Sequence, residues 1–192
     1  RPPLDSIPRP CPSDGVIMGL GKIRTRTAAL CAMDFSVMSG SLGSQAAWKL
    51  ADLVELAGQK RIPLISMFDS AGLRVGIKGG DCGLSGLGRL IRNYSRYSGV
   101  IPRISLVLGP CTGLMAAMAV LSDFLIMRED AAFMWYGGAR ESDDAGTAEF
   151  HMEKSGQCDL IARDDEAALE SAKALLGFLP HSCWAPPPSE ET

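Results

Sequence analysis

The stretch that most constrains this chain runs from residue 104 to residue 120 and reads ISLVLGPCTGLMAAMAV. It begins with a short apolar, β-branched run, breaks at Gly109-Pro110, and resumes as a segment of small and aliphatic residues. The pattern predicts a buried strand, a tight turn and a buried helix. Backbone N–H groups at the start of such a helix lack intrahelical partners and suit an oxygen that becomes negative during a reaction. An ordinary strand-to-helix connection without a ligand explains the same residues.

Strand and helix patterns alternate along most of the chain, and this alternation predicts an α/β fold with right-handed crossovers. The 192 residues are enough for a single domain with its own core. We expect a proline-rich arm over residues 1–12, the folded domain over residues 13–180 and a flexible tail over residues 181–192. The predicted strands are 16–23, 28–33, 64–68, 104–108, 124–127 and 132–136, and the predicted helices are 45–58, 88–98, 149–156 and 164–179, besides the helix that ends at residue 120.

Charge and cysteine usage exclude several classes of partner and site. The formal net charge of −3 gives no electrostatic basis for binding nucleic acid or a membrane surface. No apolar run is long enough to span a bilayer, and no signal-peptide pattern occurs. The 6 cysteines are scattered without a C-x-x-C pair, and the only histidines are His151 and His181, so we expect no metal in this chain. Single cysteines within apolar segments are typical of a reducing, cytoplasmic compartment.

Three loops follow the ends of predicted strands, at residues 34–43, 69–88 and 109–114. In open α/β sheets, ligands bind at the carboxyl ends of the strands. Each of these loops is rich in small residues and poor in side chains that do chemistry. The pattern therefore indicates a site that binds and polarises through backbone amides rather than through a charge-relay set of side chains.

Nucleophilic side chains are weaker candidates. Ser70 lacks the glycine two residues earlier that a nucleophile elbow uses, and His151 lies between two glutamates in a predicted helix, which favours a surface or interface position. Cys111 stands at the turn before the buried helix, but no histidine is near it in sequence, so a packed small residue explains it better than a nucleophile. No Walker lysine and no G-x-G-x-x-G turn indicates a phosphate cradle.

Two carboxylates and an aromatic pair leave alternatives open. Asp34 and Asp69 each lie near a predicted strand end, where a carboxylate serves either as a general base or, more often, as a turn-forming group. Trp135 and Tyr136 come at the end of a predicted strand, where they either wall a pocket or simply close the sheet.

Several motifs resemble those of biotin-dependent acyl-CoA carboxyltransferases, and they occur in the family's order. Residues 34–43 (DFSVMSGSLG) resemble D-F-T-V-x-G-G-S-x-G, and residues 69–74 (DSAGLR) resemble D-S-G-G-A-R. Residues 101–113 (IPRISLVLGPCTG) resemble V-P-Q-I-S-x-x-x-G-P-C-A-G, and residues 151–156 resemble H-x-x-x-S-G. The resemblance covers nearly the whole chain.

This family comprises the β subunits of propionyl-CoA and acetyl-CoA carboxylase and related decarboxylase subunits. The resemblance implies a crotonase-like ββα superhelix, which is an α/β fold, in a single domain. It implies carboxyl transfer between carboxybiotin, borne on a separate carrier protein or domain, and the α-carbon of an acyl-CoA. It covers only the N-terminal half of such enzymes, so it also implies an oligomer in which a C-terminal-half chain completes the site.

The family's chemistry passes through two enolate-like oxyanions that are stabilised by backbone donors. The resemblance assigns the backbone N–H groups of Gly113 and Leu114 to one oxyanion hole. It places further residues along the cleft for CoA or biotin, namely Gly40, Ser41, Ser70, Ala71, Gly72 and Thr112. Leu114 stands where the family has a second glycine. Ser39 and Ala71 also replace glycines, and Leu73 replaces an alanine. Such changes narrow the pocket, alter the accepted acyl group or mark a chain that no longer catalyses.

Three functions therefore compete. The first is the N-terminal half of an acyl-CoA carboxyltransferase, or of a decarboxylase subunit that runs the same transfer in reverse onto biotin. The second is a non-catalytic crotonase-like module that binds acyl-CoA or holds an assembly together. The third is a crotonase-like hydrolase or decarboxylase that uses no biotin and employs Asp69 or a glutamate as acid or base.

Overall fold

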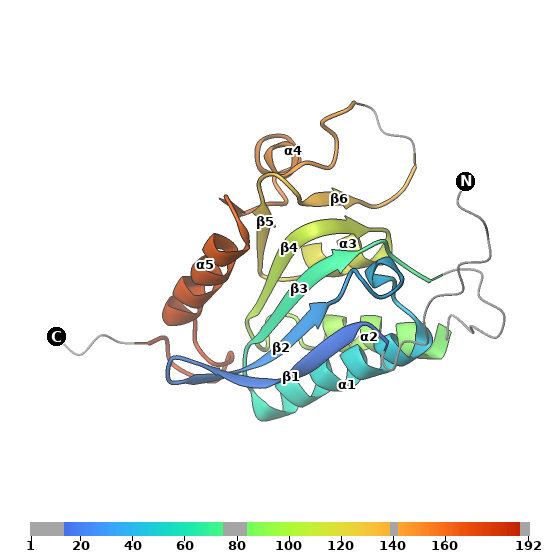
Figure 1. Cartoon of the computed structure of the whole chain (residues 1–192). Helices are drawn as coiled ribbons and strands as arrows, with labels where there is room; N and C mark the ends of the chain where they lie inside the picture. Colours follow the sequence, from blue (N-terminus) through green and yellow to red (C-terminus); the bar gives the residue numbers. More distant parts are fainter. Residues whose placement is uncertain (1–13, 75–83, 139–141, 189–192) are drawn as a thin grey trace.

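A computed structural model describes residues 14–74, 84–138 and 142–188 of the chain (Figure 1). These residues form one mixed sheet with helices on both faces, and the strand order is β1-β2-β3-β4-β5-β7, with β6 paired to the end of β4. The strands are β1 (Val16–Ile23), β2 (Arg26–Met33), β3 (Leu64–Ser70), β4 (Arg103–Thr112), β5 (Phe124–Arg128), β6 (Phe133–Trp135) and β7 (Leu160–Ala162). The helices are the 3-10 helix η1 (Met38–Gly40), then α1 (Ser44–Lys60), α2 (Leu84–Arg96), α3 (Leu114–Val120), α4 (Ala148–Glu153) and α5 (Asp165–Phe178).

The predicted hairpin and the predicted alternation of strand and helix are confirmed. β1 and β2 pair antiparallel, and β2 to β5 then run parallel because each connection between them crosses over one face of the sheet. The buried strands β3 and β4 are apolar on both sides, as expected for strands covered on both faces. The carboxyl ends of β2, β3 and β4 therefore lie side by side at one edge of the sheet.

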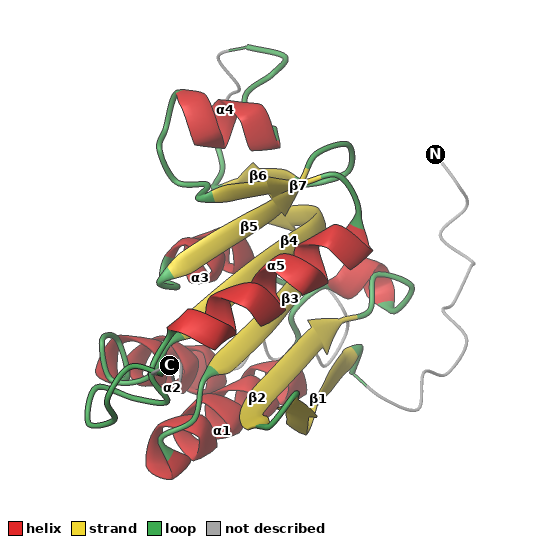
Figure 2. Cartoon of the chain, turned by 90° about the vertical axis from the view of Figure 1, so that its left-hand side faces the viewer, coloured by secondary structure: helices red, strands yellow, loops and turns green. Residues whose placement is uncertain are grey.

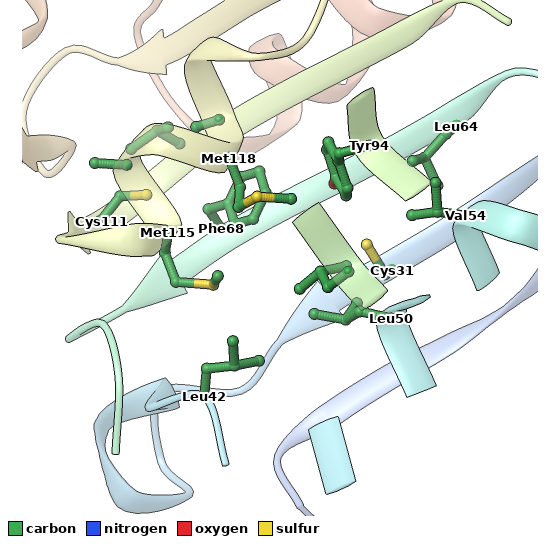
Figure 3. Packing of buried hydrophobic residues seen from close by; sticks show 14 of the residues in the cluster. Cys31, Leu42, Leu50, Val54, Leu64, Phe68, Tyr94, Cys111, Met115 and Met118 are labelled. Carbon is green, nitrogen blue, oxygen red and sulfur yellow. The ribbon is translucent and has the colours of Figure 1, made fainter. Parts of the chain in front are cut away.

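Two apolar clusters separate the sheet from its helices. The larger cluster lies between the sheet and α1, α2 and α3, where Phe68 of β3 packs near Met115 and Met118 of α3 (Figure 3). The smaller cluster lies under α5, which crosses the opposite face of the sheet (Figure 2). α5 begins with Asp164 as its N-cap, whose side chain accepts a hydrogen bond from the N–H of Ala167, and so its predicted acidic start is confirmed.

The predicted break at Gly109-Pro110 is wrong, because β4 continues through these residues to Thr112. The pairing of β3 with β4 shifts register here, from Phe68 opposite Val107 to Ser70 opposite Cys111. A bulge of this kind tolerates a proline, which has no N–H to give to a ladder. The turn into α3 is consequently made by one residue, Gly113, with φ of 58° and ψ of −125°.

Two other expectations need correction. The predicted helix 88–98 begins earlier, at Leu84, and much of the glycine-rich connection before it lies outside the described residues. The expected flexible tail begins as packed chain: Ser182 is buried and the N–H of Cys183 donates to the carbonyl oxygen of Val100 at 2.9 Å. The predicted arm over residues 1–12 lies outside the described residues.

Candidate active site

The loops after β2 and β3 are joined by hydrogen bonds at the carboxyl edge of the sheet. The N–H of Ala71 donates to the carbonyl oxygen of Ser39 at 2.9 Å, and the N–H of Leu42 donates to that of Gly72 at 2.8 Å. Gly72, with φ of 92°, packs against the end of β4, because a Cβ built on it would lie 3.0 Å from the carbonyl oxygen of Thr112. The structure thus brings the loops after β2 and β3 together beside the end of β4.

Gly40 is the residue at which the loop after β2 closely approaches the backbone of β3. Its φ is +61°, and a Cβ built on it would lie 2.0 Å from the carbonyl oxygen of Asp69. No side chain fits at that distance from backbone, so the approach of the two loops requires glycine here.

Ser70, the last residue of β3, stabilises this contact through hydrogen bonds of its side chain. Its side chain is fully buried, and its hydroxyl donates to the carbonyl oxygen of Gly40 at 2.7 Å while accepting from the N–H of Gly72 at 3.1 Å. The hydroxyl of Ser70 therefore links the backbone of Gly40 to that of Gly72, which favours a structural role over a nucleophilic one. Ser41 lies beside this group, where its hydroxyl donates to the carbonyl oxygen of Met38 at 2.7 Å.

The N–H of Gly113 is already engaged. It donates to the carbonyl oxygen of Trp135 in β6 at 2.8 Å, which extends the pairing of β6 with the end of β4. The N–H of Leu114 belongs to the first turn of α3, where a helix offers its donors no intrahelical acceptor. Of the two predicted hole residues, Gly113 thus uses its N–H within the fold, whereas Leu114 has no intrahelical acceptor for its N–H.

Leu73 presents a second backbone donor that the motifs did not indicate. Leu73 forms an isolated parallel bridge with Leu42. Two hydrogen bonds make this bridge: the N–H of Leu42 donates to the carbonyl of Gly72, and the N–H of Arg74 donates to the carbonyl of Leu42 at 3.0 Å. In such a bridge the central residue's own N–H points to the opposite side. The N–H of Leu73 is thus directed away from Leu42. No residue pattern reveals the alternation of a bridge, which explains why the sequence did not identify this donor.

Several apolar and aromatic side chains belong to the segments that carry these donors or adjoin them in sequence. Leu73 is 38% exposed and Tyr136 is 42% exposed, while Leu114 and Trp135 are half-buried. The hydroxyl of Tyr136 donates to Oε1 of Gln157 at 2.7 Å, which holds the ring at the end of β6. Exposed and half-buried apolar groups therefore lie on, or next to, the segments that carry these donors.

Asp34 and Asp69 differ in their surroundings. Asp34 accepts hydrogen bonds from the N–H and the hydroxyl of Ser36, at 2.9 and 2.6 Å, and so forms a turn. Asp69 lies within β3, and its carboxyl group packs over Gly109, whose built Cβ would lie 2.4 Å from Oδ1. That Oδ1 atom is buried and has no hydrogen-bond partner among the described residues. Burial, with the charges of Asp165 and Asp34, raises the pKa of Asp69 above its ordinary value.

This raised pKa predicts a pH-dependent stability. The pKa of Asp69 is higher in the folded chain than in the unfolded chain, where it is about 4. The free energy of unfolding therefore decreases as the pH rises from the unfolded-state pKa through the folded-state pKa. We expect Asp69→Asn to raise the melting temperature at pH 8 and to change it little at pH 4. Thermal unfolding of both proteins at the two pH values tests this, and an equal shift at both values would contradict it.

His151 and Cys111 are structural residues. The prediction of a surface or interface position for His151 is wrong, because the ring is 3% exposed. Its Nε2 lies 2.9 Å from the carbonyl oxygen of Met134, to which it donates, and its Nδ1 lies 2.9 Å from the hydroxyl of Ser155. The ring thus ties α4 to β6. Cys111 is fully buried, and burial raises the pKa of its thiol, so the prediction of a packed small residue is confirmed.

Within residues 14–74, 84–138 and 142–188, no group of three or more His, Cys, Asp or Glu side chains is placed to hold a metal ion. In the same part of the chain, no helix has the length and apolar character needed to cross a membrane. Backbone N–H groups such as those at this edge of the sheet are suited to stabilising an oxygen that becomes negative.

Comparisons with known proteins show what the chain is similar to. Residues 5–192 match the family model of the carboxyl transferase domain. The chain is 36% identical over 181 residues to the methylmalonyl-CoA carboxyltransferase 12S subunit of Propionibacterium freudenreichii subsp. shermanii, covering 89% of this chain and 34% of that protein. It is 35% identical to the propionyl-CoA carboxylase carboxyltransferase subunit of Haloferax mediterranei, covering 94% of this chain and 36% of the relative. It is 32% identical to the methylmalonyl-CoA decarboxylase subunit alpha of Propionigenium modestum, covering 88% and 34%.

Solved structures give the same result. Transcarboxylase 12S with methylmalonyl-CoA and methylmalonic acid bound superposes with a TM-score of 0.81 at 36% identity, over 88% of this chain and 34% of that one. The β subunit of geranyl-CoA carboxylase from P. aeruginosa, at 24% identity and a TM-score of 0.79, shares the fold. The predicted crotonase-like α/β class is confirmed by these structures. The chain spans about a third of the length of the curated relatives it matches.

Proposed function

The chain belongs to the carboxyl transferase family, and from that premise we propose that it is the N-terminal half of an acyl-CoA carboxyltransferase. Its reaction would move a carboxyl group between carboxybiotin and the α-carbon of an acyl-CoA. The observation that carries the proposal is that the loops after β2 and β3 meet the end of β4 at one edge of the sheet, where Leu73 and Leu114 follow Gly72 and Gly113.

Bound carboxybiotin would supply the carboxyl group. The role proposed for this chain is to bind the oxygen that becomes negative during the transfer. A backbone N–H suits that task because it is oriented before the reaction starts and needs no proton transfer of its own. The residues fit such an oxygen, since the described edge offers N–H donors and apolar side chains around them.

We assign the donors to Leu114 and Leu73. The N–H of Leu114 comes from the first turn of α3, and that of Leu73 comes from the bridge to Leu42. Gly113 would serve as the turn that aims Leu114, because its own N–H is bonded to Trp135. Lining roles remain proposed for the residues carried over from the family: Gly40, Ser41, Ser70, Ala71, Gly72 and Thr112.

The remaining components would come from other chains. We propose that a C-terminal-half carboxyltransferase chain completes the site in an oligomer and that biotin arrives on a separate carrier protein or domain. The exposed apolar edge at Leu73 and Tyr136 supports a site that another surface must cover to exclude water. We also propose a cytoplasmic location, supported by the free thiols of Cys31, Cys111, Cys158 and Cys183.

The reverse direction is a second candidate, because the matched decarboxylase subunit of Propionigenium modestum belongs to the same group of relatives. Both directions share one transition state, so the same donors would serve either. A non-catalytic acyl-CoA-binding or assembly module is the remaining alternative, supported by Leu114 in a family glycine position.

The test is carboxyl transfer by a reconstituted complex. The chain is co-expressed with candidate C-terminal-half chains from neighbouring genes, and labelled carboxyl is followed between biotin and a panel of acyl-CoAs in both directions. Transfer that requires both chains supports the proposal. Acyl-CoA binding without transfer in either direction would favour the non-catalytic module instead.

A further inference from the structure

We infer that Arg74 is a positioning residue for the proposed carboxyl transfer and acts by holding the peptide that presents the N–H of Leu73. The inference rests on the proposed function. It concerns a residue that touches no reacting atom and works through the backbone beside it.

Each nitrogen atom of the Arg74 guanidinium group makes a hydrogen bond to the protein. Nη1 lies 2.8 Å from Oδ1 of Asp14, Nε donates to the hydroxyl of Ser41 at 3.2 Å, and Nη2 donates to the carbonyl oxygen of Ser41 at 2.8 Å. The side chains of Arg74 and Asp14 are 20% and 16% exposed. The positive charge is paired with Asp14 and all three nitrogens are bonded within the protein, so a structural role for the charge is favoured over substrate binding.

The same residue also closes the backbone bridge that aims Leu73. The N–H of Arg74 donates to the carbonyl of Leu42, while the carbonyl of Gly72 accepts from the N–H of Leu42. Both peptides next to Leu73 are therefore tied to Leu42, and the Arg74 side chain ties them further to the adjacent Ser41. Arg74 consequently helps to fix the direction of the Leu73 N–H in two ways. Its backbone N–H is bonded to Leu42, and its side chain is bonded to Ser41.

Asp14 anchors this arrangement to a helix. Its Oδ2 accepts a hydrogen bond from the N–H of Ala46 in the first turn of α1, whose own N-cap, Gly43, offers no side chain for capping. A carboxylate is favoured at this end of a helix by the helix dipole. Gly43 also leaves room for the contact, because a Cβ there would lie 2.8 Å from Nη1 of Arg74. Arg74 thus connects a loop of the site to the 17-residue helix α1, a rigid element.

A donor that acts on the transition state must be held close to its productive position, and a displacement of about 1 Å costs on the order of 10²-fold in rate. Loss of a positioning residue therefore lowers kcat and leaves KM for acyl-CoA nearly unchanged. Loss of a substrate-binding residue raises KM instead. A purely stabilising residue changes only the melting temperature.

The experiment measures kcat and KM for acyl-CoA in the complex with the C-terminal-half chain. For Arg74→Gln we expect kcat to fall about 10–100-fold with KM within about twofold of the parent. Arg74→Lys keeps one cation for Asp14 but not the two contacts to Ser41, so we expect a smaller fall in kcat with little change in melting temperature. The matched control is Arg89→Gln, which removes ion pairs of α2 with Asp52 and Glu55 of α1 and should leave kcat unchanged.

The inference on Arg74 and the proposed carboxyl transfer are contradicted by different outcomes of this experiment. A parent complex that transfers carboxyl and keeps its kcat in both folded Arg74 variants overturns the inference alone. A rise in KM without a fall in kcat also overturns it, because Arg74 would then bind substrate. A parent complex with no transfer in either direction overturns the proposed function, and the inference with it.

Discussion

Replacement of Leu114 with proline is expected to lower kcat for carboxyl transfer by about 10²–10³-fold, the usual cost of removing one oxyanion donor. Proline removes the N–H of Leu114 together with the aliphatic side chain, which packs against the larger apolar cluster. Leu114 is the first residue of α3, the helix position that accepts proline best because its N–H has no intrahelical partner. The effect should fall on kcat, measured in the complex with the C-terminal-half chain, rather than on KM.

The control for this variant is Leu114→Ala, which keeps the N–H and shortens the side chain. We expect Leu114→Ala to retain most of the parent kcat. If the proline variant folds with a melting temperature close to that of the alanine variant and transfers carboxyl equally well, then Leu114 does not supply a catalytic donor. Gly113 is unsuited to the same test, since its φ of 58° excludes proline.

Gly40→Ala is expected to destabilise the chain by roughly 2–5 kcal/mol, the sum of about 1–2 for a side chain in the left-handed region and about 1–3 for overpacking. A Cβ at Gly40 would lie 2.0 Å from the carbonyl oxygen of Asp69, so the two site loops must separate. Because Ser70 holds the carbonyl of Gly40, the separation also breaks that hydrogen bond. Urea unfolding measures the loss of free energy.

Gly99→Ala separates the two causes. Gly99 has φ of +68°, and a Cβ built on it meets nothing within 4 Å. We expect this variant to lose only the conformational part, about 1–2 kcal/mol. Equal losses for the two variants would show that the close approach at Gly40 contributes nothing to stability.

The sequence predicted the elements well because the signals for them are local. The apolar period of α1, the acidic first turn of α5 and the alternation of strands and helices are each contained in a short window. The extension of β4 through Pro110 was not predictable in this way, since it depends on a bulge opposite Asp69 and on pairing with β6. The burial of His151 likewise depends on Met134, which lies in another element.

The site was predicted only in part, and for a similar reason. Small residues identified the loops that carry Gly40, Gly72 and Gly113, because glycine marks positive φ and close approach in any fold. Which N–H groups stay available depends on pairings between distant segments, such as Gly113 with Trp135 and Leu42 with Leu73. The family motif therefore indicated Gly113 and Leu114 together, but not that the fold already uses the N–H of Gly113.

The order of strands in the sheet has a consequence for how the chain acquires its structure. From β1 to β5, each strand pairs with the strand that precedes it in the chain, so the sheet can grow by addition at one edge as the polypeptide leaves the ribosome. The loops after β2, β3 and β4 would then assemble before β7 and α5 are synthesised. Pulse-labelled hydrogen exchange during refolding would detect this order as earlier protection of β2 to β4 than of β7. The donors proposed for catalysis would thus belong to the part of the domain that folds first.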